Sequence, residues 1–206
     1  MGSVMNMIYL AKSTQSELII DKSRFITNLY VVTQIDDVHT YLKDIRKIHK
    51  DANHYCYAYI IRDGREVKAS DDGEPAKTAG VPILEVLKHH DLTDVLCVVT
   101  RYFGGIKLGA GGLIRAYTNS VSHALSETAF LLKEKRSIAE IELPYALYDT
   151  FSYQLKDHIT IIDQQFAVDV KLTVILNGIT YAEIKDKFHT VKLTDLGETI
   201  VDIPLE

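Results

Sequence analysis

The stretch that decides the fold reads VLCVVTRYFGGIKLGAGGLIRAY and spans Val95 to Tyr117. Its first five residues are apolar and three of them are β-branched, a pattern typical of a strand buried on both faces. Five glycines follow within nine positions. Apolar residues then recur every three or four positions as far as about Leu132, which predicts an amphipathic helix. We therefore expect a central strand, a glycine-rich loop and a helix, in that order.

The loop and the start of the helix together predict an anion-binding site. Glycines bring backbone N–H groups close to a ligand, and a helix N-terminus offers unpaired N–H donors and a partial positive charge. The spacing matches neither the GxxxxGK[ST] phosphate loop nor the GxGxxG dinucleotide fingerprint. Alternatively, the glycines serve only to turn a strand sharply into a helix. The candidate anion-binding or nucleic-acid-binding residues are Arg101, Gly104, Gly105, Lys107, Gly109, Gly111, Gly112 and Arg115.

A second candidate feature is the acidic loop SDDGEPAKTAG, residues 70–80. Asp71, Asp72 and Glu74 could hold Mg²⁺ together with a ligand phosphate. Equally, Asp71 and Asp72 could form a turn whose side chains bond the local backbone. His54, at the start of the expected strand HYCYAYII, could reach either loop or be a plain hydrogen-bonded histidine. We treat these four residues as possible auxiliary groups and assign no metal site; Mg²⁺ remains a possible cofactor.

Other catalytic signatures are missing from the sequence. It contains no HExxH, CxxC or GxSxG motif, which argues against a metal hydrolase and a nucleophile-elbow hydrolase. Cys56 and Cys97 lie in apolar runs and are interpreted as small core residues. Tyr55, Tyr57 and Tyr59 share one face of their strand, either as a stacking platform for bases or, more commonly, as packing under a helix. No nucleophile or general base can be assigned, so an enzyme is the less favoured class.

Charge divides the chain of 206 residues into two parts. Residues 1–136 hold 18 Lys and Arg against 16 Asp and Glu, a net of +2, whereas residues 137–206 hold 5 against 12, a net of −7. This asymmetry favours two domains and predicts that any nucleic-acid contact comes from the first. No apolar stretch is long enough to span a membrane and no signal-peptide pattern opens the sequence, so we expect a cytoplasmic protein with no membrane partner.

Periodicity predicts the remaining elements. After a polar leader, the first half contains a hairpin of strands at 17–20 and 25–33, a helix at 36–50, strands at 54–61 and 67–70, and a helix at 78–90. Beyond a hinge at 134–136, the second half contains a strand at 137–143, a helix from 144, strands at 159–162 and 166–176, a helix ending near 189, and a strand at 198–203. The second half therefore follows the β-α-β-β-α-β order of a ferredoxin-like domain.

At TAGVPILEVL, from Thr78, and at VVTRYFGGIKLGAGGLIRAY, from Val98, the sequence resembles the IMPACT family, and within it the bacterial YigZ and YvyE type. The resemblance implies an α+β fold of two domains. Residues 1–135 would form the IMPACT N-terminal domain, similar to domain 2 of ribosomal protein S5. Residues 136–206 would form a ferredoxin-like βαββαβ domain resembling the last domain of elongation factor G.

The resemblance also implies a role linked to translation. Eukaryotic members are translational regulators that depend on an additional N-terminal domain, so their role is not transferred. We expect a protein that binds RNA or the ribosome through the glycine-rich loop, with a possible protein partner in translation control. One alternative is an enzyme that uses the same loop to hold a small phosphorylated substrate or nucleotide, since related folds occur in small-molecule kinases. Another is a protein-binding regulator without an anion site.

Overall fold

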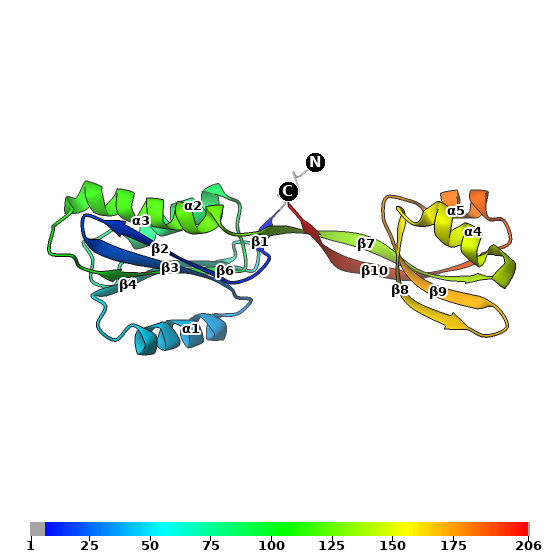
Figure 1. Ribbon diagram of the computed structural model, residues 1–206, viewed down its shortest axis with the longest axis horizontal. Helices are drawn as coiled ribbons and strands as arrows, with labels where there is room; N and C mark the ends of the chain where they lie inside the picture. Colours follow the sequence, from blue (N-terminus) through cyan, green and yellow to red (C-terminus); the bar gives the residue numbers. More distant parts are fainter. Residues whose placement is uncertain (1–6, 206) are drawn as a thin grey trace. The chain divides into compact units, whose positions relative to one another are not determined.

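A computed structural model describes residues 7–205. The chain folds into two compact units, the first formed by residues up to 133 together with those from 203 onward, and the second by residues 134–202. Each unit combines helices with an antiparallel sheet, so the fold class is α+β, as expected (Figure 1). The described helices include none that is both long and apolar enough to cross a membrane.

The first unit is built on a five-stranded antiparallel sheet in the order β2-β3-β6-β4-β5. Helices α2 and α3 cover one face of this sheet and α1 covers the other (Figure 1). Its elements are β2 (Thr14–Ile20), β3 (Ser23–Val31), α1 (Ile35–Ile48), β4 (His54–Ile61), β5 (Glu66–Ser70), α2 (Gly80–His89), β6 (Val95–Tyr102) and α3 (Gly109–Ser126).

The prediction of a central strand buried on both faces is confirmed at β6. Val95, Cys97 and Val99 pack beneath α2 and α3, whereas Leu96 and Val98 pack in the core that α1 covers. All five are fully buried. Because alternate residues of a strand point to opposite faces, an unbroken apolar run is what this position requires.

The tyrosine stripe of β4 also lies in the core under α1. Tyr55 and Tyr59 are buried there beside Val38 and Ile45 of the helix, and Tyr57 packs against the same cluster. The stripe is therefore committed to helix packing, the more common of the two predicted roles.

The second unit shows the predicted β-α-β-β-α-β order. Its sheet runs β10-β7-β9-β8, and its core is formed by alternate residues of the strands together with apolar residues of the two helices. The elements are β7 (Phe130–Leu143), α4 (Tyr145–Leu155), β8 (Ile159–Phe166), β9 (Val170–Leu176), α5 (Tyr181–Lys187) and β10 (Lys192–Pro204).

Near the junction of the units, one sequence-based boundary is wrong and another differs in its local structure. The helix expected to reach Leu132 ends at Ser126, because the chain from Phe130 onward pairs with β1 (Ile8–Leu10), a short strand missed in the supposed polar leader. The hinge expected at 134–136 agrees in position with the boundary between the units after residue 133, but the chain there is a strand, since β7 continues through it. A third difference concerns the strand expected at 166–176. In the structure, β8 extends to Phe166, a turn follows at 167–169, and β9 begins at Val170.

Candidate functional site

The glycine-rich loop between β6 and α3 is shaped by a close approach and by positive φ angles. A Cβ atom on Gly104 would lie 2.0 Å from the carbonyl carbon of Lys22, so no larger residue fits there. Gly105 and Gly109 have φ angles of +85° and +68°, values that L-residues with a side chain rarely adopt. These three glycines therefore satisfy steric and conformational requirements of the backbone, which is the structural alternative predicted from the sequence. Because they have no side chains, they also leave the backbone of the loop uncovered.

The start of α3 is exposed and has no cap. Leu108, at the N-cap, provides no side-chain hydrogen bond, and the first turn contains no acidic residue. Lys107 and Arg115 are exposed and form no ion pair with any described residue. The unpaired N–H groups of the first turn, the helix dipole and two unpaired cations therefore meet at one place, which is favourable for an anion.

Arg101 is placed differently from what its sequence position suggests. Only 4% of the residue is exposed, and its Nη1 donates to Oε1 of Glu74 over 2.6 Å. Its Nη2 donates to Oγ of Ser23, which also accepts from the backbone N–H of Gly104. The guanidinium lies 5.6 Å from the ring centre of Phe103. Arg101 thus ties the acidic loop, β3 and the glycine-rich loop together, and its charge is largely balanced by Glu74.

Glu74 is the centre of a buried polar network. Its Oε1 also accepts a hydrogen bond from the hydroxyl of Tyr117 on α3, at 2.8 Å, and that hydroxyl lies 3.3 Å from Sγ of Cys56. Burial is the main reason why the pKa of the Cys56 thiol is raised to about 12 and why the pKa of Tyr117 is raised as well. Both groups therefore stay protonated at neutral pH, so Tyr117 can act as a hydrogen-bond donor to Glu74.

Asp71 is occupied by the backbone of its own loop. Its carboxylate accepts from the N–H groups of Lys77, Ala79 and Gly80 over 2.8–3.0 Å. Burial raises the pKa of this carboxyl, but the three N–H donors outweigh that effect and hold the pKa below its usual value. Asp71 thereby caps the start of α2, the turn-forming role predicted for it.

Asp72 and His54 also have partners within the protein. The Asp72 carboxylate binds Nη2 of Arg46 at 2.6 Å and the backbone N–H of Tyr55 at 2.8 Å. Nδ1 of His54 lies 2.9 Å from the Asp72 carbonyl oxygen, while its Nε2 lies 3.9 Å from Oε2 of Glu74. Within residues 7–205, no group of three or more His, Cys, Asp and Glu side chains is arranged to hold a metal ion.

These elements enclose a cavity of about 240 Å³. Of the candidates predicted from sequence, the structure brings Arg101, Lys107, Gly109 and Glu74 together in its lining. The remaining lining is mostly apolar and consists of Pro75, Phe103, Leu108, Ala110 and Leu113. The other candidates lie outside the lining: Gly104, Gly105, Gly111, Gly112, Arg115, His54, Asp71 and Asp72. Gly111 and Gly112 belong to the first turn of α3, and Arg115 lies one turn further along.

Sequence reasoning missed three contributors to this site. Ser23 holds both Arg101 and the loop, Tyr117 bonds Glu74, and the side chain of Asn53 accepts from the N–H of Phe103. Tyr117 carried a usable signal, since a hydroxyl within an apolar helix stripe needs a buried partner. Ser23, the first residue of β3, and Asn53, just before β4, lie far from the loop in sequence and carried none.

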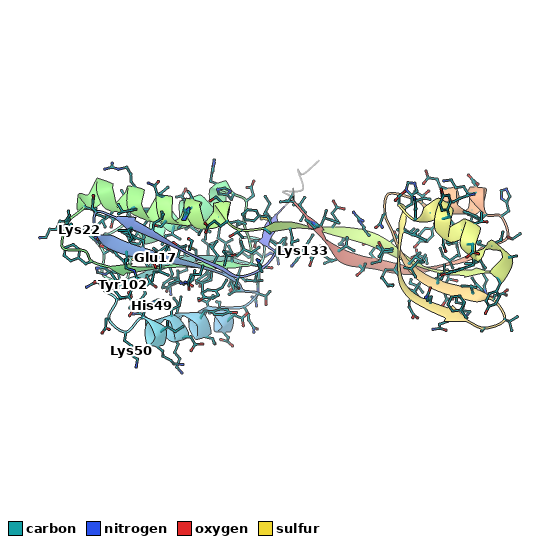
Figure 2. The ribbon with its side chains drawn as sticks, viewed as in Figure 1. Glu17, Lys22, His49, Lys50, Tyr102 and Lys133 are labelled. Carbon is teal, nitrogen blue, oxygen red and sulfur yellow. The ribbon has the colours of Figure 1, made fainter. Side chains whose placement is uncertain are left out.

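Further polar side chains lie near the same end of the first unit. Figure 2 shows Lys22, His49 and Tyr102 at the end where β6 leads into the loop. Nδ1 of His49 is 2.9 Å from the hydroxyl of Tyr102, and the guanidinium of Arg24 lies 5.2 Å from the centre of the Tyr102 ring. Burial lowers the pKa of His49, and Arg24 lowers it further, so this histidine is neutral at physiological pH.

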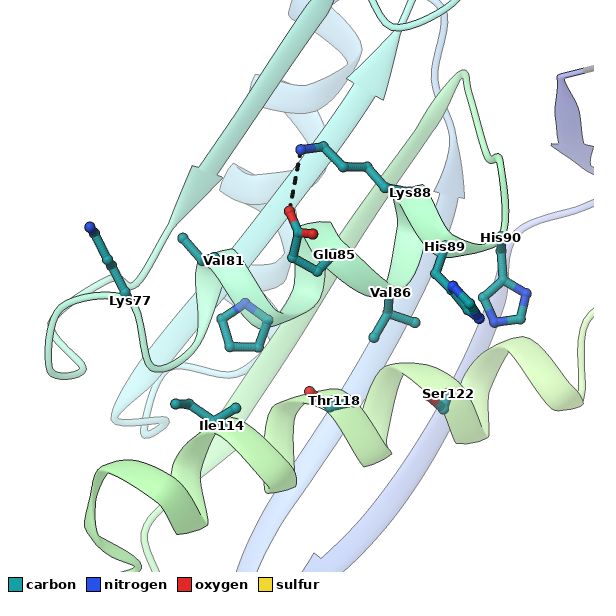
Figure 3. Close-up of a pocket in the computed structure, with 11 residues that line it drawn as sticks. Lys77, Val81, Glu85, Val86, Lys88, His89, His90, Ile114, Thr118 and Ser122 are labelled. Atoms are coloured by element: carbon teal, nitrogen blue, oxygen red, sulfur yellow. Dashed lines mark hydrogen bonds and ion pairs between the residues drawn. The ribbon is translucent and has the colours of Figure 1, made fainter. Parts of the chain in front are cut away.

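A wider hollow of about 800 Å³ lies between α2 and α3 (Figure 3). Its apolar floor includes Val86 and Ile114, and its rim holds the pair Glu85–Lys88, joined over 3.2 Å. His89 and His90 lie at its far end, with their ring centres 5.8 Å apart. Among the described residues, no carboxylate lies close enough to these rings to form an ion pair. The hollow therefore lacks the polar network of the smaller cavity.

Comparison with known proteins identifies the family. Residues 21–125, just over half of the chain, match the Impact N-terminal domain. The chain belongs to the IMPACT family. An IMPACT family member of Haemophilus influenzae is 33% identical over 190 residues, which cover 87% of this chain and 92% of that protein. YvyE of Bacillus subtilis, another member, is 44% identical over 144 residues, which cover 69% of this chain and 66% of YvyE. The chain is therefore of the YvyE and YigZ type.

Solved structures agree with this assignment. The crystal structure of a hypothetical protein shares 31% sequence identity and a TM-score of 0.60, with 91% of this chain and 95% of that chain covered. This agreement supports a two-unit IMPACT fold. The two-domain translational regulator Yih1 is a more distant neighbour, with 22% identity and a TM-score of 0.34 over 57% of this chain and 45% of that chain. A likeness this low carries no functional argument.

Proposed function

We propose that this protein binds RNA or the ribosome through the start of α3, as a translation-linked regulatory protein. The observation that carries the proposal is the exposed, uncapped first turn of an 18-residue helix, flanked by two cations that form no ion pair with any described residue. Phosphate groups match this arrangement, since they accept hydrogen bonds from backbone N–H groups and are attracted by the helix dipole. Lys107, Arg115 and residues 109–112 make the contact.

Arg101, Gly104 and Gly105 contribute by shaping the loop. Arg101 and Gly104 share Ser23 as a hydrogen-bond partner, which fixes where the loop leaves β6. Gly105 supplies the positive φ that returns the chain toward α3. The buried guanidinium adds little net charge because Glu74 neutralises it, so the positive potential of the site comes from Lys107, Arg115 and the helix.

The two units are proposed to be distinct domains with separate tasks. Residues 1–135 form the domain similar to domain 2 of ribosomal protein S5, and residues 136–206 form the ferredoxin-like domain resembling the last domain of elongation factor G. The strand order β10-β7-β9-β8 supports the second assignment. The net charge of −7 over residues 137–206 disfavours phosphate contact there, so this domain serves protein contacts in translation control.

Co-sedimentation tests the proposal. Purified protein is centrifuged with ribosomes and with free RNA at low and at moderate salt, beside the double variant Lys107→Ala, Arg115→Ala. Association that weakens with salt is expected, because phosphate contacts release counterions, and it should be lost in the variant. Arg101 is left unchanged, since its removal would leave Glu74 buried without its cation.

The matched control removes two exposed cations elsewhere in the first unit, Lys12→Ala and Lys68→Ala, neither of which forms an ion pair with a described residue. This control lowers the net charge by the same amount and should keep most of the association. Equal loss in both double variants would show attraction to overall charge only and would contradict a site at α3.

A second candidate function is an enzyme acting on a small phosphorylated substrate or nucleotide. It is favoured by the carboxylate of Glu74, which lines the cavity with Arg101 while His54 lies 3.9 Å away. Buried acidic and basic groups at a cavity are the usual setting for acid–base chemistry. This function predicts that a nucleotide with Mg²⁺ raises the melting temperature. A nucleotide panel without any shift would count against it.

A further inference from the structure

The cavity beside α3 contains a carboxylate oxygen that a simple phosphate site would not need. The Glu74 side chain is only 4% exposed, and its Oε1 is taken by Arg101 and Tyr117. Its Oε2 accepts no hydrogen bond from any described residue, and the ring of His54 is too distant at 3.9 Å. Oε2 is not among the solvent-inaccessible atoms that lack a partner, so it is free to accept a hydrogen bond from a ligand.

A buried atom of the neighbouring Arg101 also lacks a partner. Nε of Arg101 is inaccessible to solvent and makes no hydrogen bond with a described residue, and Arg101 lines the cavity with Glu74. The lining also includes Lys107, together with Gly109 and Ala110 of the first turn of α3. The cavity therefore has one part with a free carboxylate oxygen, next to a neutralised ion pair, and one positive part. A ligand that fits both must carry a hydrogen-bond donor and an anion.

The size and the apolar lining restrict that ligand further. A volume of about 240 Å³ lies below the range of about 300–1,000 Å³ usual for drug-sized ligands, so it accommodates one nucleotide-sized group at most. Phe103 is 45% exposed at this cavity and offers a ring on which a base or a ribose can stack. Double-stranded nucleic acid is far too wide to enter.

We propose, as an extension of the RNA binding proposed above, that the cavity takes the 3′-terminal nucleotide of an RNA. The vicinal 2′ and 3′ hydroxyls donate to Oε2 of Glu74, as carboxylates do to ribose hydroxyls in dinucleotide-binding proteins. The last phosphodiester lies at the first turn of α3 near Lys107. An internal nucleotide fits poorly, because its 3′ oxygen is esterified and has no proton to donate to Glu74.

The test uses the unmodified protein and RNAs that differ only at one end. A 12-nucleotide unstructured RNA labelled at its 5′ end is titrated by fluorescence anisotropy with a 3′ diol, with a 2′,3′-dideoxy end and with a 3′-phosphate. The diol end should bind about tenfold or more tightly than the dideoxy end, the effect of losing a hydrogen bond to a charged group. The 3′-phosphate should also bind weakly, because its phosphorylated 3′ oxygen cannot donate a hydrogen bond to Glu74.

A circular RNA of the same sequence serves as the control without ends, and it should bind as weakly as the dideoxy RNA. Equal affinities of all four RNAs, with the salt dependence retained, would overturn end recognition and leave RNA binding standing. Binding of none of the four would overturn both proposals. In the Glu74→Gln variant, provided that its melting curve still shows a folded protein, the preference for the diol should shrink while binding of the circular RNA is retained.

Discussion

The helices α3 and α5 begin in opposite ways, although both follow a glycine-containing turn. In α5, Thr180 and Glu183 form a complete capping box, in which each side chain bonds the other residue's backbone N–H. In α3, the N-cap Leu108 contributes no such bond. A cap contributes about 0.5–2 kcal/mol, so the start of α3 forgoes stability that α5 retains. α1, α2 and α4 also lack a hydrogen bond from their N-cap side chain, and it is the exposure of α3 beside Lys107 that supports the proposal of a ligand at its free N–H groups.

The charged pairs of the two units differ in the same sense. Arg101 and Glu74 have side-chain exposures of only 5% and 4%, whereas Lys171 of the second unit contacts Glu140 and Glu142 at the surface. Burying a charge pair brings a desolvation cost that its mutual attraction often fails to repay. The first unit thus contains a costly polar centre beside an open helix start at one cavity. Among the described ion pairs of the second unit, none is buried in this way, although α4 also begins without a side-chain cap.

The largest effect is expected from breaking the buried pair. Arg101→Ala should destabilise the protein by about 3–5 kcal/mol, because it leaves Glu74 buried without its cation. Lys171→Ala, which removes an exposed cation from the second unit, should cost at most about 1 kcal/mol. Hydrogen exchange of the full chain, followed separately for β3, β6 and β9, measures both variants. Equal, small effects at the two sites would remove the energetic distinction between the units.

A somewhat smaller loss is expected from closing the space at Gly104. A methyl group there would meet the Lys22 backbone at 2.0 Å, and since a backbone yields less easily than a side chain, we expect a cost of about 3 kcal/mol. Gly105→Ala is the matched control. A Cβ atom at this position would have no atom within 4 Å, and the φ angle is +85°, so the substitution should cost about 1–2 kcal/mol. Thermal unfolding compares them, and a milder effect at Gly104 than at Gly105 would contradict this assignment.

How far the sequence predicts the fold can be judged from single elements. The buried strand β6 and the order of elements in the second unit followed from periodicity and turn residues, which depend on local sequence. The end of α3 did not, because Thr128 and Leu131 continue the helical spacing although the chain leaves the helix after Ser126. Pairing of residues 130–132 with β1 overrides that local preference, and a three-residue strand has too little pattern to be recognised.

The site was predictable only in part, for a related reason. The open helix start and its cations are contiguous in sequence, so the loop could be found from glycine spacing alone. The partner of Arg101 could not, since Glu74 lies 27 positions earlier and reaches it from a loop beyond the paired strands. Strand register brings His54 opposite Arg101, and such register depends on the whole sheet. The charge of Arg101 therefore looked unpaired in the sequence, whereas Glu74 neutralises it in the folded protein.

At the first turn of α3, a single substitution is expected to change stability least and RNA affinity most. Ala110→Glu places a carboxylate at an exposed position, beside the free N–H groups of the first turn. The helix dipole should stabilise it by about 0.3–1 kcal/mol, which roughly offsets the lower helix propensity of Glu relative to Ala. RNA affinity should nevertheless fall strongly, because the new carboxylate competes with phosphate for the same donors. Melting temperature and RNA anisotropy, measured on one preparation, separate the two effects.

Two controls isolate the role of that charge. Ala110→Gln has a similar shape without the charge, so it should leave RNA affinity within about twofold of the unmodified protein, since only the repulsion of phosphate is removed. Thr180→Ala removes the cap of α5 and should cost about 1 kcal/mol without any effect on RNA. If Ala110→Glu bound RNA as well as Ala110→Gln, the open start of α3 would not be the phosphate site, and the contrast between the two helices would concern stability alone.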